Sequence, residues 1–356
     1  VVNYSSGTGS NTLTFDYLIG AGHTSGDLDY VANNSLALNG GTIKDAALND
    51  ATLTLANPNA VNSLRANKNL VIDGVAPTIT GVTSTTADDS YRQGETIAIK
   101  VAFSEVVNVT GTPQLTLETG GSDAVVNYSG VGSGTNTLTF NYTIGAGETS
   151  GDLDYVANNS LALNGGTIRD AALNDATLTL SNPGDPNSLG NNQDLIIDTS
   201  VPTINSVSLN AGNSVLIVTF AEDVYTNDGS GNLVAADFAL NITGGVATVA
   251  ATPTGVTKTS QSIWMLELNI SGTANGSETL DVVPAAGNAI YDKAGNAAST
   301  SQSNNTASLT EKVLPTVTGV TSTTSNGSYK QGQTIAITVG FSEVVNVTGT
   351  PQLTLE

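Results

Sequence analysis

Short stretches of alternating hydrophobic and polar residues recur along the whole chain. TIAIKVAFSE, which begins at Thr96, and NTLTFNYTI, which begins at Asn136, both carry apolar residues at every second position. A period of two places these side chains on one face of a β-strand. Turn-forming clusters such as LNGGT and GSGT separate the stretches, and no stretch has the period of a long helix. The pattern predicts an all-β protein. Its predicted buried strand positions include Ile97, Ile99, Val101, Phe103, Leu138, Phe140, Tyr142 and Ile144.

The chain is built from repeats. VVNYSSGTGSNTLTFDY at Val1 returns 124 residues later as VVNYSGVGSGTNTLTFNY, and PTITGVTSTT at Pro77 returns at Pro315 as PTVTGVTSTT. Between these copies, VLIVTFAEDV stands where the others have IAIKVAFSEV, which indicates a diverged repeat. We therefore divide the chain into the back part of one repeat, a complete repeat, a diverged repeat and the front part of another, at residues 1–76, 77–200, 201–314 and 315–356.

Each repeat has room for about seven short strands, which is typical of an immunoglobulin-like β-sandwich. The expected architecture is a set of tandem sandwiches in an extended rod. Trp264 shares its strand face with Leu266 and is expected in the core of the diverged repeat. Tyr30 and Tyr155 are expected to hold loops through their hydroxyl groups, like the tyrosine corner of such sandwiches.

Composition narrows the possible functions. The 356 residues carry a formal net charge of -21, with a pI near 4.1 and no cysteine. This charge argues against binding to nucleic acid or to anionic membranes and favours divalent cations. No apolar run approaches the roughly 18 residues of a membrane span. A cysteine-free, acidic chain rich in Thr, Asn and Gly is expected outside the cell, on a bacterial surface or secreted.

The sequence does not indicate an enzyme. The single histidine, His23, is replaced by Glu148 in the next copy, and there is no cysteine nucleophile, G-x-S-x-G elbow or phosphate loop. Paired acids can hydrolyse glycosides, but only 5% of the residues are aromatic, and no aromatic-lined cleft is indicated.

Acidic residues recur at the start of each repeat. In an immunoglobulin-like strand order, the linker before Pro77, the strand carrying FSE and the loop RDAALND meet at one end. The diverged repeat has a similar set in IIDTSVP, FAEDV and IYDKAGNA. Ca²⁺ takes six to eight oxygen ligands from such groups. The alternative is that these residues only form turns. The predicted ligands are Asp73, Glu105, Asp170 and Asn174 at the first junction, and Asp198, Glu222, Asp292 and Asn296 at the second.

Two other acidic positions are weaker candidates. Before Pro315 the linker is LTEKVLP, without an aspartate, so Glu343 is expected to bind calcium weakly or not at all unless Glu311 reaches it. The pair Asp152 and Asp154, which repeats Asp27 and Asp29, is either a second metal site or a turn cap.

The motifs PTITGVTS, GETIAIKVAFSE, NTLTFNYTIGAGETSGDLDY and LALNGGTIRDAALNDATLTL resemble the tandem immunoglobulin-like and cadherin-like repeats of very large bacterial surface proteins, including giant adhesins. The resemblance covers essentially the whole chain and is looser over 201–314. It implies β-sandwiches in extended rods, with calcium at the junctions, that serve as spacers, adhesion modules or fibre components. It implies no enzymatic activity.

Two functional hypotheses follow. The first is a calcium-stiffened structural spacer or fibre element. The second is an adhesion module that binds a ligand such as a cell-surface glycan, centred on the diverged repeat and its insertion VYTNDGSGNLVAADF, which contains Asp228 and Asp237.

The two partial repeats are complementary in sequence. Residues 315–356 and 1–76 together make one repeat, less the loop TGGSDA. Either the chain is a window on a longer array of neighbouring repeats, or the tail of one subunit completes the head of the next in a head-to-tail assembly.

Overall fold

A computed structural model describes residues 1–227 and 229–356 and confirms the all-β class. Its helices, in the part of the chain that it describes, are two four-residue α-helices and one short 3₁₀-helix. None of these is long or apolar enough to cross a membrane. The chain divides into two compact units, Val1–Thr199 and Ser200–Glu356, each described below by itself.

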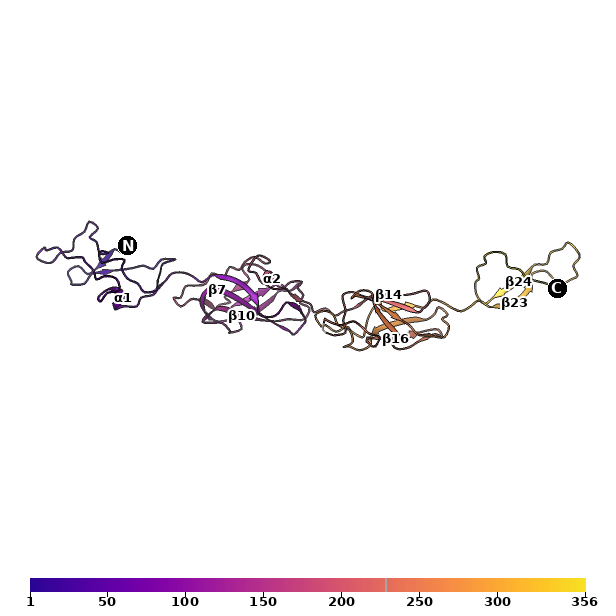
Figure 1. Ribbon diagram of the computed structural model, residues 1–356. Coiled ribbons are helices and arrows are strands. Elements are labelled where there is room, and N and C mark those ends of the chain that lie inside the picture. Colours follow the sequence, from indigo (N-terminus) through magenta and orange to yellow (C-terminus); the bar gives the residue numbers. More distant parts are fainter. Residues whose placement is uncertain (228) are drawn as a thin grey trace. The chain divides into compact units, whose positions relative to one another are not determined.

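The first unit contains a sparsely structured segment followed by a more regular one (Figure 1). Residues 1–76 carry short elements: β1 (Tyr4–Ser6), β2 (Thr14–Phe15), β3 (Thr24–Ser25), α1 (Leu64–Asn67) and β4 (Ile72–Asp73). The rest of the unit carries β5 (Ile79–Ser84), β6 (Asp89–Tyr91), β7 (Thr96–Thr110), β8 (Gln114–Leu117), β9 (Ala124–Asn127), β10 (Thr135–Thr143), β11 (Leu161–Ala162), β12 (Thr167–Arg169), α2 (Leu189–Asn192) and β13 (Leu195–Ile197).

The long strand β7 organises the first unit. Its first part lies between β10 and β5, both antiparallel to it, and its last three residues pair with β12. The register shifts against both β5 and β10 near Phe103, where the strand changes partners. A second sheet has the order β11-β8-β9, and β13 runs parallel to β6.

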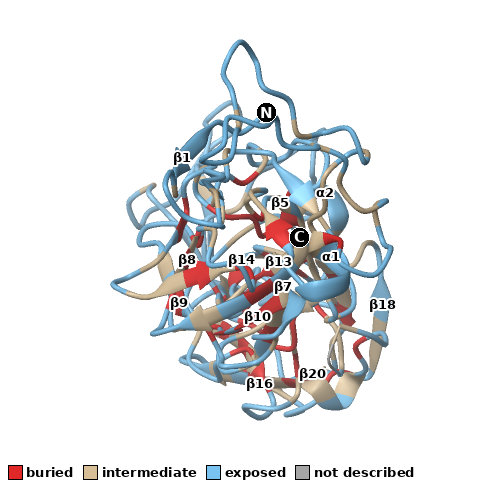
Figure 2. Cartoon of the chain, turned by 90° about the vertical axis from the view of Figure 1, so that its left-hand side faces the viewer, coloured by how far each residue is buried: buried red, intermediate tan, exposed pale blue. Residues whose placement is uncertain are grey.

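The core of this unit draws side chains from both sheets. In Figure 2 the buried positions gather on β7, β8 and β10. The alternation read from the sequence is confirmed, because every predicted inward residue is at most 2% exposed: Ile97, Ile99, Val101, Phe103, Leu138, Phe140, Tyr142 and Ile144. Leu115 and Leu117 of β8 join them at 0% exposure.

Two tyrosine hydroxyl groups fasten loops, as predicted. Tyr155 donates to the carbonyl of Ser181 at 2.8 Å, and Tyr30 donates to the carbonyl of Ala56 at 2.8 Å. The two bonds are equivalent between the two copies of the repeat.

The second unit is also made of small sheets. Its elements are β14 (Ile204–Leu209), β15 (Val215–Phe220), η1 (Ala235–Asp237), β16 (Phe238–Thr243), β17 (Thr248–Val249), β18 (Gly255–Lys258), β19 (Ile263–Glu267), β20 (Ile270–Ser271), β21 (Thr279–Pro284), β22 (Thr306–Ser308), β23 (Val317–Ser322) and β24 (Ile337–Phe341). The larger sheets have the orders β14-β15-β19-β18 and β16-β21-β22, and β23 and β24 form a separate pair.

Trp264 lies in the core of the second unit, as predicted. It is 1% exposed, it packs with Leu216, Phe238 and Leu280, and its ring nitrogen donates to the carbonyl of Gln261 at 2.9 Å. The indole is therefore both packed and hydrogen-bonded, as a buried tryptophan requires.

Glu278 is a fully buried carboxylate in the same unit, at 0% exposure. Its oxygens accept backbone N–H groups of Val246 at 3.0 Å, Ala247 at 3.2 Å, Asn275 at 3.0 Å and Gly276 at 3.0 Å. Burial alone would raise the pKa of Glu278, but these backbone donors outweigh it and lower the pKa to about 2. The charged side chain ties two loops together.

The insertion of the diverged repeat contains Asp237, whose Oδ2 accepts the backbone N–H of Val234 at 2.7 Å and caps η1. Burial raises the pKa of Asp237. Asp228, the other acid named for this insertion, lies outside the described residues.

Candidate metal centre

Three predicted ligands converge in the first unit. Asp73, Glu105 and Asp170 each offer a carboxylate oxygen, and these oxygens all lie within 4.8 Å of one another. Asp170 is 2% exposed, and the other two are half-buried. Three carboxylates at this separation repel one another unless a cation lies between them.

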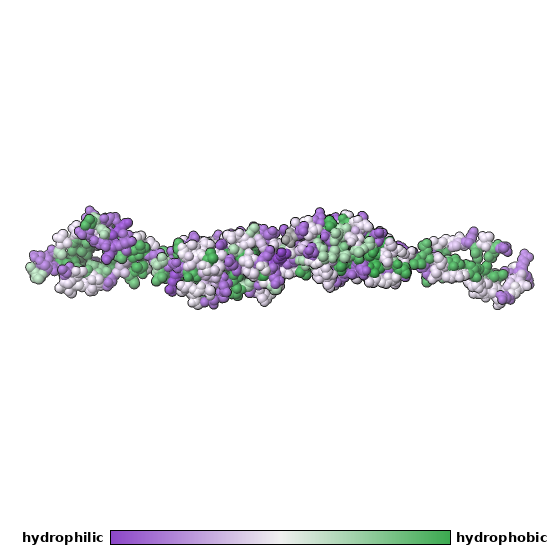
Figure 3. Space-filling model, turned by 90° about the horizontal axis from the view of Figure 1, so that it is seen from below, coloured by the Kyte–Doolittle hydropathy of each residue, from purple (hydrophilic) through white to green (hydrophobic). Residues whose placement is uncertain are grey.

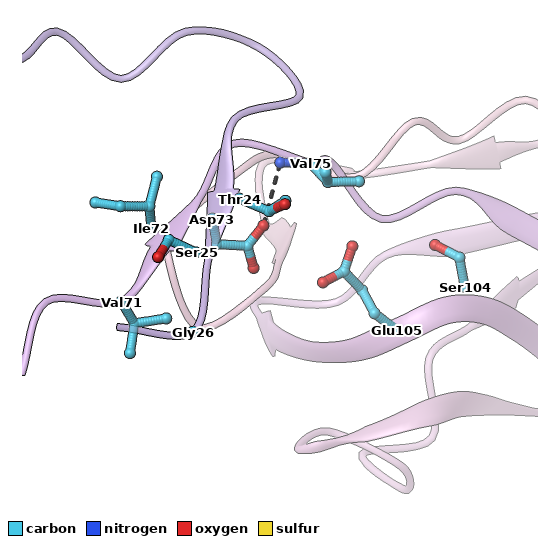
Figure 4. Close-up of a pocket in the computed structure, with 9 residues that line it drawn as sticks. All are labelled: Thr24, Ser25, Gly26, Val71, Ile72, Asp73, Val75, Ser104 and Glu105. Atoms are coloured by element: carbon cyan, nitrogen blue, oxygen red, sulfur yellow. Dashed lines mark hydrogen bonds between the residues drawn. The ribbon is translucent and has the colours of Figure 1, made fainter. Parts of the chain in front are cut away.

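The linker places Asp73. Strand β4, which ends at Asp73, pairs with β3, so that Asp73 lies opposite Thr24. The Oδ1 atom of Asp73 accepts the backbone N–H of Val75 at 3.1 Å, which forms a local turn. The carboxylate of Asp73 is directed toward Glu105 (Figure 4).

Ser104 anchors the chain just after the linker. Its backbone N–H donates to the carbonyl of Thr78 at 2.8 Å, and its hydroxyl accepts the N–H of Thr78 at 3.0 Å. This double contact fixes the start of the repeat to β7 beside Glu105. Residues 315–356 contain the same contact, because Ser342 makes the same two hydrogen bonds with Thr316, at 2.9 and 3.0 Å.

Glu105 stands where β7 changes partners. It follows Phe103, the last residue paired with β5, and precedes the stretch paired with β12. Glu105 lies inside β7 and not at its end, since the strand continues to Thr110. Burial, followed by the negative charges of Asp73 and Asp170, raises the pKa of Glu105. The raised pKa of Glu105 thus reflects its partial burial first and the two neighbouring carboxylates second.

A five-residue loop places Asp170. Its Oδ1 accepts the N–H of Asn174 at 2.8 Å, and its Oδ2 accepts the Asn174 side-chain amide at 2.7 Å. Leu173, between them, has a φ of 72°, in the left-handed region. The loop of the first segment is built in the same way from Asp45 and Asn49, with bonds of 2.8 and 2.9 Å. There, hydrogen bonds from Asn49 lower the pKa of Asp45.

Asn174 also holds the linker. Its side-chain nitrogen donates to the carbonyls of Asp73 at 3.0 Å and of Val75 at 3.3 Å. The amide therefore joins the Asp170 loop to the Asp73 turn. Its observed bonds position the carboxylates, and its role as an oxygen ligand stays a prediction.

The carboxylates of Asp73 and Glu105 face an open cavity of about 600 Å³. Figure 4 shows the two groups turned toward each other from β4 and β7. Three further polar residues line this cavity and were not among the predicted ligands: Thr24, Ser25 and Ser104. Their hydroxyl groups and nearby carbonyls are further oxygen donors. Only the position of Ser104 beside Glu105 in the FSE motif could have indicated one of them.

The second unit brings together two ligands of the other predicted set. Glu222 and Asp292 offer carboxylate oxygens within 4.8 Å of each other, and Asp292 is 1% exposed. The loop repeats the geometry around Asp170, because Asp292 accepts the backbone N–H and the side-chain amide of Asn296, both at 2.8 Å. Gly295, with a φ of 87°, takes the place of Leu173. Asp198 belongs to the first unit, and its participation stays a prediction.

The remaining acidic candidates differ from these sets. Glu343 belongs to no group of three metal-compatible side chains among residues 1–227 and 229–356. Asp154 accepts the N–H of Tyr155 at 2.9 Å and that of Gly184, 30 residues further along the chain, at 3.0 Å, so its carboxylate joins two separate loops. In the first copy, Asp27 pairs with Arg65 at 3.1 Å.

Comparisons with known proteins add no identification. No protein-family model matches the chain, and neither a curated protein nor a solved structure is significantly similar to it.

The chemistry of the centre follows from its donors. The three side chains are carboxylates, without histidine or cysteine, and they supply hard oxygen atoms. Such donors suit Ca²⁺ and Mg²⁺ better than Zn²⁺.

Proposed function

We propose that this chain is a structural segment of tandem immunoglobulin-like β-sandwich repeats, of the kind found in bacterial surface adhesins, and that calcium at the start of each repeat stiffens the array. No catalytic role is proposed. The proposed location is outside the cell, on the basis of an acidic composition with a net charge of -21.

The observation that carries this proposal is the convergence of Asp73, Glu105 and Asp170 within 4.8 Å. These residues come from a linker, a strand and a loop that are far apart in sequence. A cation bound between them would join the linker to the body of the repeat. Because Asp73 immediately precedes that repeat, binding would hold the linker residues Gly74 and Val75 against it.

Calcium binding also explains why the chain keeps these charges close together. Three mutually repelling carboxylates destabilise a metal-free fold, and a divalent ion converts this repulsion into attraction. The equivalent loop at Asp292 and Asn296 has different neighbouring residues but the same hydrogen bonds, so the geometry is not an accident of recent duplication.

The direct test is calcium binding to the whole chain, measured by isothermal titration calorimetry after chelator treatment. The proposal predicts two sites, and Asp170→Asn should abolish one of them. Asp123→Asn is the matched control, since Asp123 is an exposed acid in the same unit and its substitution removes the same charge. Absence of binding at millimolar calcium, or equal effects of the two variants, would refute the metal centre.

Stiffening is a separate property and needs its own measurement. Small-angle X-ray scattering with calcium and with chelator should show a narrower distribution of particle dimensions when calcium is bound. Binding without any change in dimensions would support the metal centre but refute the stiffening.

A further inference from the structure

The second unit carries a polar cavity on the outer face of its three-stranded sheet β16-β21-β22. The cavity measures about 410 Å³ and is lined by residues of this sheet and of the loop 299–305. Nine of the ten described residues that line it have polar side chains, the tenth is Val283, and none of the ten is basic or aromatic. Because residues of intermediate hydropathy, drawn nearly white, cover much of the surface in Figure 3, the cavity is distinguished by its concave shape rather than by its polarity alone.

The strand register sets three polar groups of the cavity in a row. Asn241 of β16 lies opposite Asp281 of β21, and Asp281 lies opposite Thr306 of β22. Neighbouring strands are about 4.7–4.9 Å apart, so the three side chains stand side by side on one face of the sheet. The preceding residues Leu240 and Leu280 are 5% and 1% exposed in the core, so the row faces away from the core.

The loop beside the cavity is held in place by two side chains. The side-chain oxygen of Gln302 accepts the backbone N–H of Ile204 at 2.8 Å. The side-chain amide of Asn305, which is buried, donates to the carbonyl of Val282 at 3.0 Å and to Oδ1 of Asp281. The protein's own hydrogen bonds therefore form the cavity before a ligand binds, as in most small-molecule sites.

Other lining groups are available to a ligand. Among the described residues, the side chains of Asn241, Thr243, Thr279 and Thr306 make no hydrogen bond with another part of the protein. Asp281 uses Oδ1 for the loop, which leaves Oδ2 as an acceptor. The free groups are thus one amide, several hydroxyl groups and one carboxylate oxygen.

These groups match a neutral compound with several hydroxyl groups. A hydroxyl group both donates and accepts, so it can donate to Asp281 while it accepts from an amide or from a threonine hydroxyl. A hydrogen bond to a carboxylate is stronger than one between neutral groups. The same carboxylate repels an anionic ligand, and one carboxylate supplies too little charge for a divalent cation.

We infer that this cavity binds a neutral saccharide, with Asp281 as the central acceptor and with Asn241 and Thr306 on either side of it. The site lies within the second unit and needs no calcium. It is independent of the metal centre, so calcium binding by Asp281→Asn should equal that of the natural chain.

Ligand-observed NMR on the full chain, in chelator, tests the site. The probes are the methyl glycosides of glucose, galactose and mannose, each with its uronic acid as the anionic partner. At least one neutral glycoside should bind with a dissociation constant in the millimolar range. Its uronic acid should bind about 10-fold more weakly, because the anion meets the Asp281 carboxylate.

Variants locate the binding in the cavity. Asp281→Asn keeps an oxygen acceptor for the Asn305 amide but removes the charge, so binding should weaken about 10-fold and the discrimination against the uronic acid should decrease. Asn241→Ala truncates an exposed side chain and should also weaken binding. The matched controls are Glu267→Gln and Asn269→Ala, at exposed positions of the same unit outside the cavity, and both should bind like the natural chain.

Three results would overturn the inference: no binding of any neutral glycoside, equal binding of the uronic acids, or equal losses in the cavity and control variants. A tetrasaccharide of the sugar that binds then distinguishes two sources of this chemistry. Binding at least as tight as that of the methyl glycoside indicates a glycan chain, and exclusion of the tetrasaccharide indicates a free sugar.

Discussion

Asp73→Asn gives the most informative test of the metal centre, because its effect on stability should change sign with calcium. Asparagine keeps the Oδ1 acceptor that Asp73 offers to the N–H of Val75, so the turn is retained. The substitution removes one of three mutually repelling charges. In chelator the variant should therefore be more stable than the natural chain, and in calcium less stable.

The separations within the centre set the magnitude. Two like charges 4.8 Å apart repel by about 3.5 kcal/mol at an effective dielectric constant of about 20, and by about 0.9 kcal/mol in water. Asp73 and Glu105 are half-buried, so we expect about 1 kcal/mol for each of the two repulsions removed. Calcium at 100 times its dissociation constant stabilises the natural chain by about 2.7 kcal/mol. This stabilisation exceeds the repulsion energy that the substitution removes.

Differential scanning calorimetry in chelator and in calcium measures the reversal. For a unit of this size, 1 kcal/mol corresponds to about 2–4 °C in melting temperature. Fluorescence of Trp264, the only tryptophan, assigns the transition of the second unit, and the other transition belongs to the first. Asp123→Asn should show no reversal. A variant that is less stable than the natural chain in chelator, or that gains as much from calcium, would refute the electrostatic reasoning.

Three further predictions concern the two cores. Trp264→Ala should destabilise the second unit by about 3–5 kcal/mol in denaturant titrations, because it leaves a large cavity, and should not affect the first. Tyr155→Phe removes the bond to Ser181 and should cost the first unit about 0.5–1.5 kcal/mol, whereas Tyr291→Phe serves as a control in the other unit. Glu278 has a pKa of about 2 in the folded chain against an ordinary value of 4.5, so its stabilisation is present above pH 4.5 and is lost as the pH falls toward 2. In an acid titration followed by Trp264 fluorescence, the stability of Glu278→Gln should therefore fall less with decreasing pH than that of the natural chain. Identical acid curves would contradict the assigned pKa.

Strand faces and the meeting of distant acids could be predicted from the sequence. Alternation determines which side chains of β7 and β10 are buried, since a strand presents successive residues to opposite faces. The convergence of Asp73, Glu105 and Asp170 was inferred from an expected strand order, and the three residues do lie together, although Glu105 is inside β7 and not at a strand end. Both predictions depend on the regular geometry of strands and sheets.

Features that depend on tertiary contacts could not be predicted in this way. The continuation of β7 to Thr110 depends on a change of partner strand, which the local pattern does not encode. Glu278 follows a Gly-Ser pair and resembles a turn residue, but its N–H donors come from two separate loops. The amide bonds of Asn174 to the linker likewise span about a hundred residues of sequence.

Because Glu278 is buried against Gly245, a substitution at either position affects the other. A side chain at Gly245, whose φ is 53°, would place its Cβ only 2.1 Å from the Glu278 carboxylate. Replacing Glu278 first would instead leave four backbone N–H groups without their acceptor. Either single substitution passes through a damaged intermediate, so the two residues should be inherited together. Diverged copies of this repeat should keep both or have lost both.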